Sequence, residues 1–245
     1  MREAIFGKMT EDWLAGYEAG IFTEFMEQRS PGHTVLDDKL YRKGLLGLLS
    51  DIDAALAALD FDRDPMALAR QEQLQAMGIC ARAVIGLAAR YADEARAQAE
   101  TEPDAARRDE LLEIAQVCDW VPAHPPRTFY EAVQSYWFIH LGVTLELNPW
   151  DSFSPGKLDQ HLLPYYQEGL AEGTLSRERA EELLQCLWIK FNNQPAPPKV
   201  GVTAAESGTY TDFSQINLGG VRPDGSDGVN EVTHLLLDVV EEMRL

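Results

Sequence analysis

The sequence is poor in cysteine, and this shortage narrows the kinds of site it can form. Cys80, Cys118 and Cys186 are spread over 245 residues, and no two of them are close in the chain. Such spacing excludes a disulfide framework and a zinc knuckle, so we predict no metal site. Each cysteine lies in apolar, helix-like sequence, which predicts reduced, buried thiols in a cytoplasmic protein.

Basic residues are also scarce. The chain has 21 Lys and Arg against 40 Asp and Glu, a net charge of −19. Nucleic acids and anionic membrane surfaces attract the opposite charge, so neither is an expected partner. The sequence has no apolar run of membrane-spanning length, and its N-terminus lacks the apolar core of a signal peptide. Phosphate loops, Rossmann fingerprints and nucleophile elbows are absent as well.

What is present is a chain of helix-like segments. Apolar residues recur at three- and four-residue spacing, which is typical of amphipathic helices. The segments at 64–102 and 104–121 resemble an antiparallel helical hairpin, whereas 209–220 has the composition of a strand. We therefore predict a mainly α fold with a few short strands. The other predicted helices lie at 10–29, 37–60, 157–170 and 175–194, and 225–245 is predicted to be a turn and a cap followed by a helix. The segment 129–147 is apolar nearly all round, which predicts a buried element.

Asp151 is the most unusual acidic residue. Its neighbours are Trp150 and Phe153, and Pro149 and Pro155 stiffen the chain on both sides. A carboxylate among aromatic rings loses hydration, which raises its pKa and suits it to hold or deliver a proton near neutral pH. The alternative interpretation is an ordinary turn-capping aspartate.

Two further segments contain candidate binding residues. His33 follows Pro31 and Gly32, which place it at a rigid corner. The stretch ESGTYTDF at 206–213 combines several hydroxyls with Gly208, and its successive backbone N–H groups could cradle a carboxylate ligand. The alternatives are a structural loop histidine and a plain edge strand.

The remaining histidines are interpreted as structural. His140 lies in the most apolar run and is expected to be a hydrogen-bonded core residue, and His124 lies among prolines. His161 and His234 are expected at helix surfaces or caps.

Four stretches together resemble the N-terminal half of glycyl radical enzymes of the pyruvate formate-lyase type. They are AGIFTEFMEQRSPGHTVLDDKLYRKG, ELNPWDSFSPGKLDQHLLPYY, LWIKFNNQPAPPKVG and YTDFSQINLGG with the DGSDGVNEV that follows. The resemblance covers essentially the whole chain. It implies that residues 1–245 are part of a single domain, helical over 1–121 and barrel-forming over 122–245, truncated at both ends. In the complete fold, a ten-stranded α/β barrel is wrapped in helices.

The resemblance is strongest to the branch of the family that dehydrates trans-4-hydroxy-L-proline to pyrroline-5-carboxylate. It implies that His33 and Asp151 are catalytic, assisting departure of the hydroxyl group. Phe25 would line the pocket, and Ser207 with the backbone around Asp212 and Phe213 would hold the substrate carboxylate. The implied partners are a hydroxyproline-like substrate, a radical-SAM activating enzyme that works under anaerobic conditions, and a second copy in a homodimer.

The chain departs from the family pattern in two respects. The family's radical-bearing cysteine lies in a loop flanked by Gly and Glu, whereas all three cysteines here lie in helical sequence. The glycyl loop is absent too, so both radical residues are expected beyond Leu245 and no cofactor is expected within this segment. The alternatives are another glycyl radical eliminase, acting on a diol, choline or a sulfonate or resembling formate acetyltransferase, and a non-catalytic helical remnant.

Overall fold

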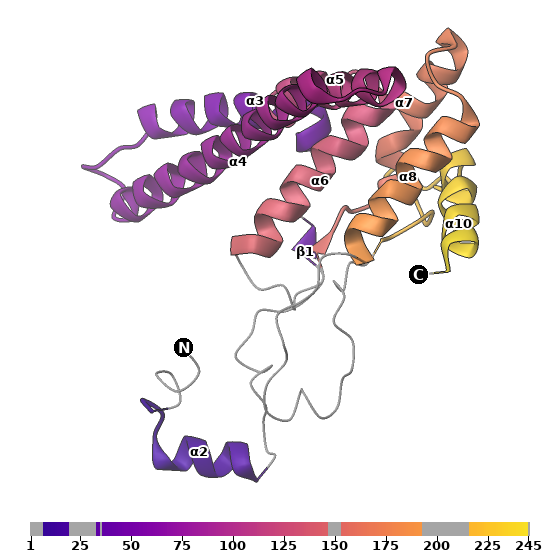
Figure 1. The fold of residues 1–245 in the computed structure, drawn as a ribbon. Helices are drawn as coiled ribbons and strands as arrows, with labels where there is room; N and C mark the ends of the chain where they lie inside the picture. Colours follow the sequence, from indigo (N-terminus) through magenta and orange to yellow (C-terminus); the bar gives the residue numbers. More distant parts are fainter. Residues whose placement is uncertain (1–6, 20–32, 35, 147–152, 193–215, 245) are drawn as a thin grey trace.

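Helices account for nearly all of the regular structure in the computed structural model of the chain, which describes residues 7–19, 33–34, 36–146, 153–192 and 216–244 (Figure 1). The predicted mainly α fold with a few short strands is confirmed. The elements are α2 (Glu11–Glu18), β1 (His33–Thr34), α3 (Lys39–Ala57), α4 (Ala67–Thr101), α5 (Ala105–Trp120), α6 (Phe129–Glu146), β2 (Phe153–Ser154), α7 (Leu158–Glu172), α8 (Arg177–Asn192) and α10 (Glu231–Met243).

Side-chain caps explain where several helices begin. The Asp104 carboxylate accepts a hydrogen bond from the Arg107 amide at 2.8 Å, and Thr10 caps α2 in the same way. Asn230 caps α10 within a reciprocal capping box with Thr233. These side chains satisfy amide groups that have no partner inside the helix. The first predicted helix starts as expected, but α2 ends at Glu18, and most of the remainder lies outside the described residues.

The predicted hairpin is confirmed, because α4 and α5 run alongside each other in Figure 1 and pack closely. Small side chains on α4 make this possible, since a stripe of alanines lets neighbouring backbones approach. The buried members of the stripe are Ala81, Ala88, Ala92, Ala95 and Ala99.

A kink at Gly44 interrupts α3, which the sequence pattern did not predict. Gly44 has φ 61°, and a Cβ atom there would lie 2.5 Å from the His124 carbonyl carbon. The kink directs two amide groups out of the helix, and Leu45 N–H donates to the Pro122 carbonyl at 2.8 Å. Only glycine fits this close approach, which joins α3 to the connector before α6.

The main core is formed by α6, α7, α8 and α10. Figure 1 shows α8 between α6 and α10, and α7 contacts both α6 and α10. The prediction that 129–147 is a buried element is confirmed for most of α6, although Leu145 near its end is exposed. His140 is 1 % exposed and is hydrogen-bonded to the Tyr136 hydroxyl at 3.0 Å, as expected of a core histidine. Large side chains that are fully buried here include Phe129, Leu158, Leu162, Leu184, Leu235 and Leu236.

The prediction of three buried thiols is wrong for two of them. Cys118 on α5 is buried, but Cys80 on α4 and Cys186 on α8 are exposed. Helical periodicity placed all three near apolar neighbours, and it could not show which helix faces a second layer would cover. None of the helices described is long and apolar enough to cross a membrane.

Candidate functional site

A parallel strand pair brings two of the predicted site segments together. β1 pairs with β2 in a register that sets His33 opposite Phe153 and Thr34 opposite Ser154. Phe153 follows Asp151 by two residues, so the His33 backbone lies beside a residue two positions after Asp151. Segments about 120 residues apart in the sequence therefore meet at one place, with β2 also contacting α6.

The residues at the start of α7, which is separated from β2 by three residues, bind a glycine that is distant in the sequence. The Asp159 carboxylate accepts the Gly219 amide at 2.7 Å. The Gly219 carbonyl accepts from the Gln160 side-chain amide at 3.0 Å and from the Lys157 ammonium group at 3.3 Å. We call Lys157, Asp159 and Gln160 the α7 clamp. It satisfies both polar backbone groups of a residue 60 positions away.

Asp159 is fully buried, with 0 % exposure. Besides Gly219, it accepts the Thr233 hydroxyl on α10 at 2.5 Å and the Gln160 amide at 2.9 Å. A buried carboxylate is tolerated only where donors replace its lost hydration, and three donors do so here. The side chain thereby joins α7, the Gly219 turn and α10.

His161, next along α7, contacts the segment that follows β1. Its Nε2 atom lies 3.1 Å from an Asp37 carboxylate oxygen, and its ring stacks on Tyr41 with a centroid separation of 4.9 Å. The side chain is 14 % exposed, so the expected surface or capping position is only partly correct. The first turns of α7 thus contact chain from the β1 side and from the Gly219 side.

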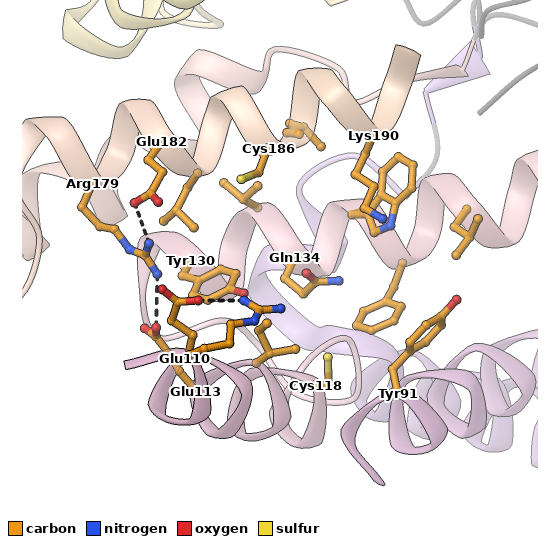
Figure 2. Close-up of a pocket in the computed structure, with 18 residues that line it drawn as sticks. Tyr91, Glu110, Glu113, Cys118, Tyr130, Gln134, Arg179, Glu182, Cys186 and Lys190 are labelled. Carbon is orange, nitrogen blue, oxygen red and sulfur yellow. Dashed lines mark hydrogen bonds and ion pairs between the residues drawn. The ribbon is translucent and has the colours of Figure 1, made fainter. Parts of the chain in front are cut away.

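A separate groove lies between the α4–α5 hairpin and helices α6 and α8 (Figure 2). Its volume is about 440 Å³, and its floor is mainly apolar and aromatic. Arg179 at its rim binds Glu182 at 2.6 Å and Glu113 at 3.1 Å, and the Arg107 guanidinium group binds Glu110. These charges neutralise one another, so they are poorly suited to bind a charged substrate.

The thiols of the groove are unreactive in character. Cys118 and Cys186 come from opposite walls, on α5 and α8 (Figure 2). Burial raises the pKa of Cys118 to about 11. Cys186 is exposed as a residue, but partial desolvation of its thiol, together with Glu182, raises its pKa as well. Both groups are therefore protonated at neutral pH, and a protonated thiol is a poor nucleophile. Within the part of the chain that the structure describes, no group of three His, Cys, Asp or Glu side chains could hold a metal ion.

Comparison with known proteins decides the family. The sequence model described as Pyruvate formate lyase-like matches residues 1–245. The chain belongs to this family. It is 58% identical to trans-4-hydroxy-L-proline dehydratase of Clostridioides difficile, over 100% of this chain and 31% of that protein. It is 33% identical to isethionate sulfite-lyase of Nitratidesulfovibrio vulgaris, over 85% of this chain and 25% of the relative.

Solved structures agree with this placement in the pyruvate formate lyase-like family. The chain superimposes with a TM-score of 0.92 on the crystal structure of hydroxyproline dehydratase from Clostridioides difficile with trans-4-hydroxy-L-proline bound. That match has 58% identity and covers 100% of this chain and 31% of the solved one. The chain therefore spans about a third of the length of the relatives it matches.

The predicted site residues are only partly within the described structure. Phe25, Asp151, Ser207, Asp212 and Phe213 lie outside the described residues. His33 is placed through the backbone pairing of β1. The roles assigned to these six residues in the pyruvate formate lyase-like family remain predictions.

No pattern in the sequence predicted the α7 clamp. Lys157 directly follows Gly156 and precedes the first residue of α7, and Asp159 and Gln160 lie in the first turn of that helix. Polar residues are common at a helix start, so these three have the composition of an ordinary amphipathic helix. The glycine pair at 219–220 marked a turn, but no local pattern connects it to α7.

Proposed function

We propose that this chain is part of a glycyl radical dehydratase that eliminates water from trans-4-hydroxy-L-proline to give pyrroline-5-carboxylate. The observation that supports this most directly is 58% identity to the Clostridioides difficile dehydratase along the whole chain. Substrate specificity in an enzyme depends on the detailed shape and polarity of its pocket, which high identity tends to preserve. The chain would form part of a single domain, with the helical segment 1–121 and the barrel-forming segment 122–245 belonging to one ten-stranded barrel.

In this proposal His33 and Asp151 assist departure of the substrate hydroxyl group. A protonated side chain close to the leaving oxygen donates a hydrogen bond and then a proton, so that water leaves in place of hydroxide. The pairing of β1 with β2 supports their joint role, since it sets the His33 backbone beside a residue two positions after Asp151.

The other proposed residues bind and orient the substrate. Phe25 packs against the ring, and Ser207 with the backbone around Asp212 and Phe213 holds the carboxylate. Correct orientation raises the rate because the entropy cost of bringing the reacting groups into position is met when the substrate binds.

The radical chemistry of the proposed enzyme, hydrogen abstraction from the carbon next to the ring nitrogen, would be supplied by a protein glycyl radical and a cysteine outside residues 1–245. The cysteines of this chain do not fit that role. Cys118 and Cys186 line the helical groove, whose lining includes no residue of the α7 clamp or the strand pair, and Cys80 lies on α4. A radical-SAM activating enzyme, anaerobic conditions, a cytoplasmic location and a homodimeric assembly complete the proposal.

The test uses the full-length protein after anaerobic activation. Turnover of trans-4-hydroxy-L-proline is measured for the unsubstituted protein and for the Asp151→Asn and His33→Gln variants. Loss of a general acid lowers turnover by roughly 100-fold or more, so we expect a decrease of that size for Asp151→Asn. Asp53→Asn on the exposed face of α3 is the matched control and should keep full turnover.

Two results would contradict parts of the proposal. Unchanged turnover in Asp151→Asn would remove that residue from the mechanism. Activity of the unsubstituted protein on glycerol, choline or isethionate, with none on trans-4-hydroxy-L-proline, would assign the chain to another eliminase of the family.

A further inference from the structure

We propose that the α7 clamp positions the substrate pocket, with Asp159 as its central positioning residue and Lys157 as its second. The inference rests on the proposed function. In this role the clamp holds the chain that follows the proposed carboxylate-binding residues against α7, the helix that begins shortly after β2.

Gly219 is bonded to the clamp through both of its polar backbone groups. Asp159 accepts its amide at 2.7 Å, while Gln160 and Lys157 donate to its carbonyl at 3.0 Å and 3.3 Å. Lys157 also donates to the Val221 carbonyl at 3.0 Å. A residue bonded through both backbone groups to one helix cannot slide along that helix or rotate without breaking several bonds.

The central residue of the clamp is a buried carboxylate. Asp159 is 0 % exposed, and burying an ionised group is costly unless every donor is well placed. The bonds of this carboxylate reach three different parts of the chain, so the side chain is suited to fixing one arrangement of those parts. The three donors come from α7, the Gly219 turn and α10.

Few residues separate the clamp from the proposed site residues in the sequence. Lys157 follows Asp151 by six residues, and Gly219 follows Phe213 by six. Six residues span at most about 20 Å when fully extended. The backbones of Lys157 and Asn217 also form a parallel bridge, so the two chains run in the same direction where the clamp joins them. Both proposed site segments are therefore anchored at one point.

The surrounding turn is shaped to fit the clamp. Gly228 packs so closely that a Cβ atom there would lie 2.5 Å from the Gln160 side-chain nitrogen and 2.9 Å from the Gly219 carbonyl oxygen. Its own amide donates to the Gly220 carbonyl at 2.6 Å. Glycine at this position leaves room for Gln160 to reach Gly219, which a larger residue would block.

The test compares variants of the activated full-length protein by steady-state kinetics and thermal unfolding. Asp159→Asn offers one side-chain oxygen where the carboxylate offers two. The asparagine therefore cannot accept both the Gly219 backbone amide and the Gln160 backbone amide. We expect KM for trans-4-hydroxy-L-proline to rise roughly 10-fold or more, the factor that a lost hydrogen bond to a charged group corresponds to. Lys157→Met, a change at a partly exposed side chain, should raise KM in the same direction by a smaller factor.

Two controls separate positioning from general destabilisation. Thr233→Val removes the side-chain acceptor for the Asn230 amide, which is one half of the α10 capping box, and one donor to Asp159. It leaves the Gly219 bond, so we expect a lower Tm with KM within twofold of the unsubstituted value. Asp224→Asn lies in the same connection, and its carboxylate bonds only locally to Ser226 in the described structure, so neither quantity should change.

A second readout does not depend on the substrate. Amide hydrogen exchange in the peptide spanning residues 207–219 should accelerate in Asp159→Asn and Lys157→Met, and remain unchanged in Thr233→Val. If the unsubstituted protein fails to turn over trans-4-hydroxy-L-proline, the proposed function fails while exchange still decides the role of the clamp. The inference would be overturned if Asp159→Asn and Lys157→Met had the same KM and the same exchange rates as Thr233→Val.

Discussion

The α7 clamp and the helical groove both contain charged side chains, yet they use charge in opposite ways. In the clamp, Asp159 is fully buried and its bonds reach chain 60 and 74 positions away. At the groove rim, Arg179 is bound by two carboxylates, Glu182 on its own helix and Glu113 on α5, and its side chain is 38% exposed. The clamp's charge holds backbone in place, whereas the rim charges cancel one another in solvent.

This difference indicates which region tolerates change. Exposed ion pairs contribute little, because water and salt screen them and ordering two long side chains costs entropy. A buried carboxylate leaves its donors without partners when it is removed, and each stranded donor carries a desolvation cost. Charge at the clamp should therefore be far more sensitive to substitution than charge at the rim.

The largest contrast is expected from Asp159→Ala. The substitution strands the Gly219 amide and the Thr233 hydroxyl in the interior, so the free energy of unfolding should fall by about 3 kcal/mol. Urea unfolding followed by circular dichroism measures this change. A loss below about 1 kcal/mol would mean that water replaces the carboxylate, and the contrast with the groove rim would disappear.

A smaller effect is expected where a glycine meets the clamp. Gly228→Ala places a methyl group against Gln160 and Gly219, and such overpacking should cost about 2 kcal/mol in the free energy of unfolding. Gly86→Ala on α4 is the matched control, since nothing lies within 4 Å of its added Cβ. Alanine favours a helix interior over glycine by about 1 kcal/mol, so this control should be stabilising. Equal effects of the same sign would contradict the close packing at Gly228.

Local features of the fold could be predicted from the sequence. Thr10 and Asp104 cap helices because their short side chains accept amides two or three residues away. The apolar composition of 129–147 indicated a buried element, since the pattern of apolar residues within one helix is a local property. The His140 environment also followed from its apolar neighbours.

Features that depend on distant partners could not be predicted in this way. The kink at Gly44 exists because the chain near His124 approaches it, and the clamp exists because Gly219 lies against α7. Neither partner is close in sequence. For the candidate site, chemical reasoning indicated His33 and Asp151, but their roles came from family resemblance. The β1–β2 pairing then brought their segments together through backbone bonds that carry no sequence signature.

The smallest effect is expected at the groove rim. Arg179→Met removes both ion pairs and keeps much of the side chain's length, so the free energy of unfolding should change by about 1 kcal/mol or less. Adding salt should shrink the difference in unfolding free energy between the two proteins, because the rim is open to solvent.

A double-mutant cycle between Arg179 and Glu113 isolates the energy of this ion pair from the other losses. A coupling energy above about 2 kcal/mol, insensitive to salt, would show that the rim charges act as a buried network does. Since Arg179 also lies over the Tyr130 ring at 5.7 Å, Arg179→Lys serves as the companion variant that keeps the charge and alters the planar contact.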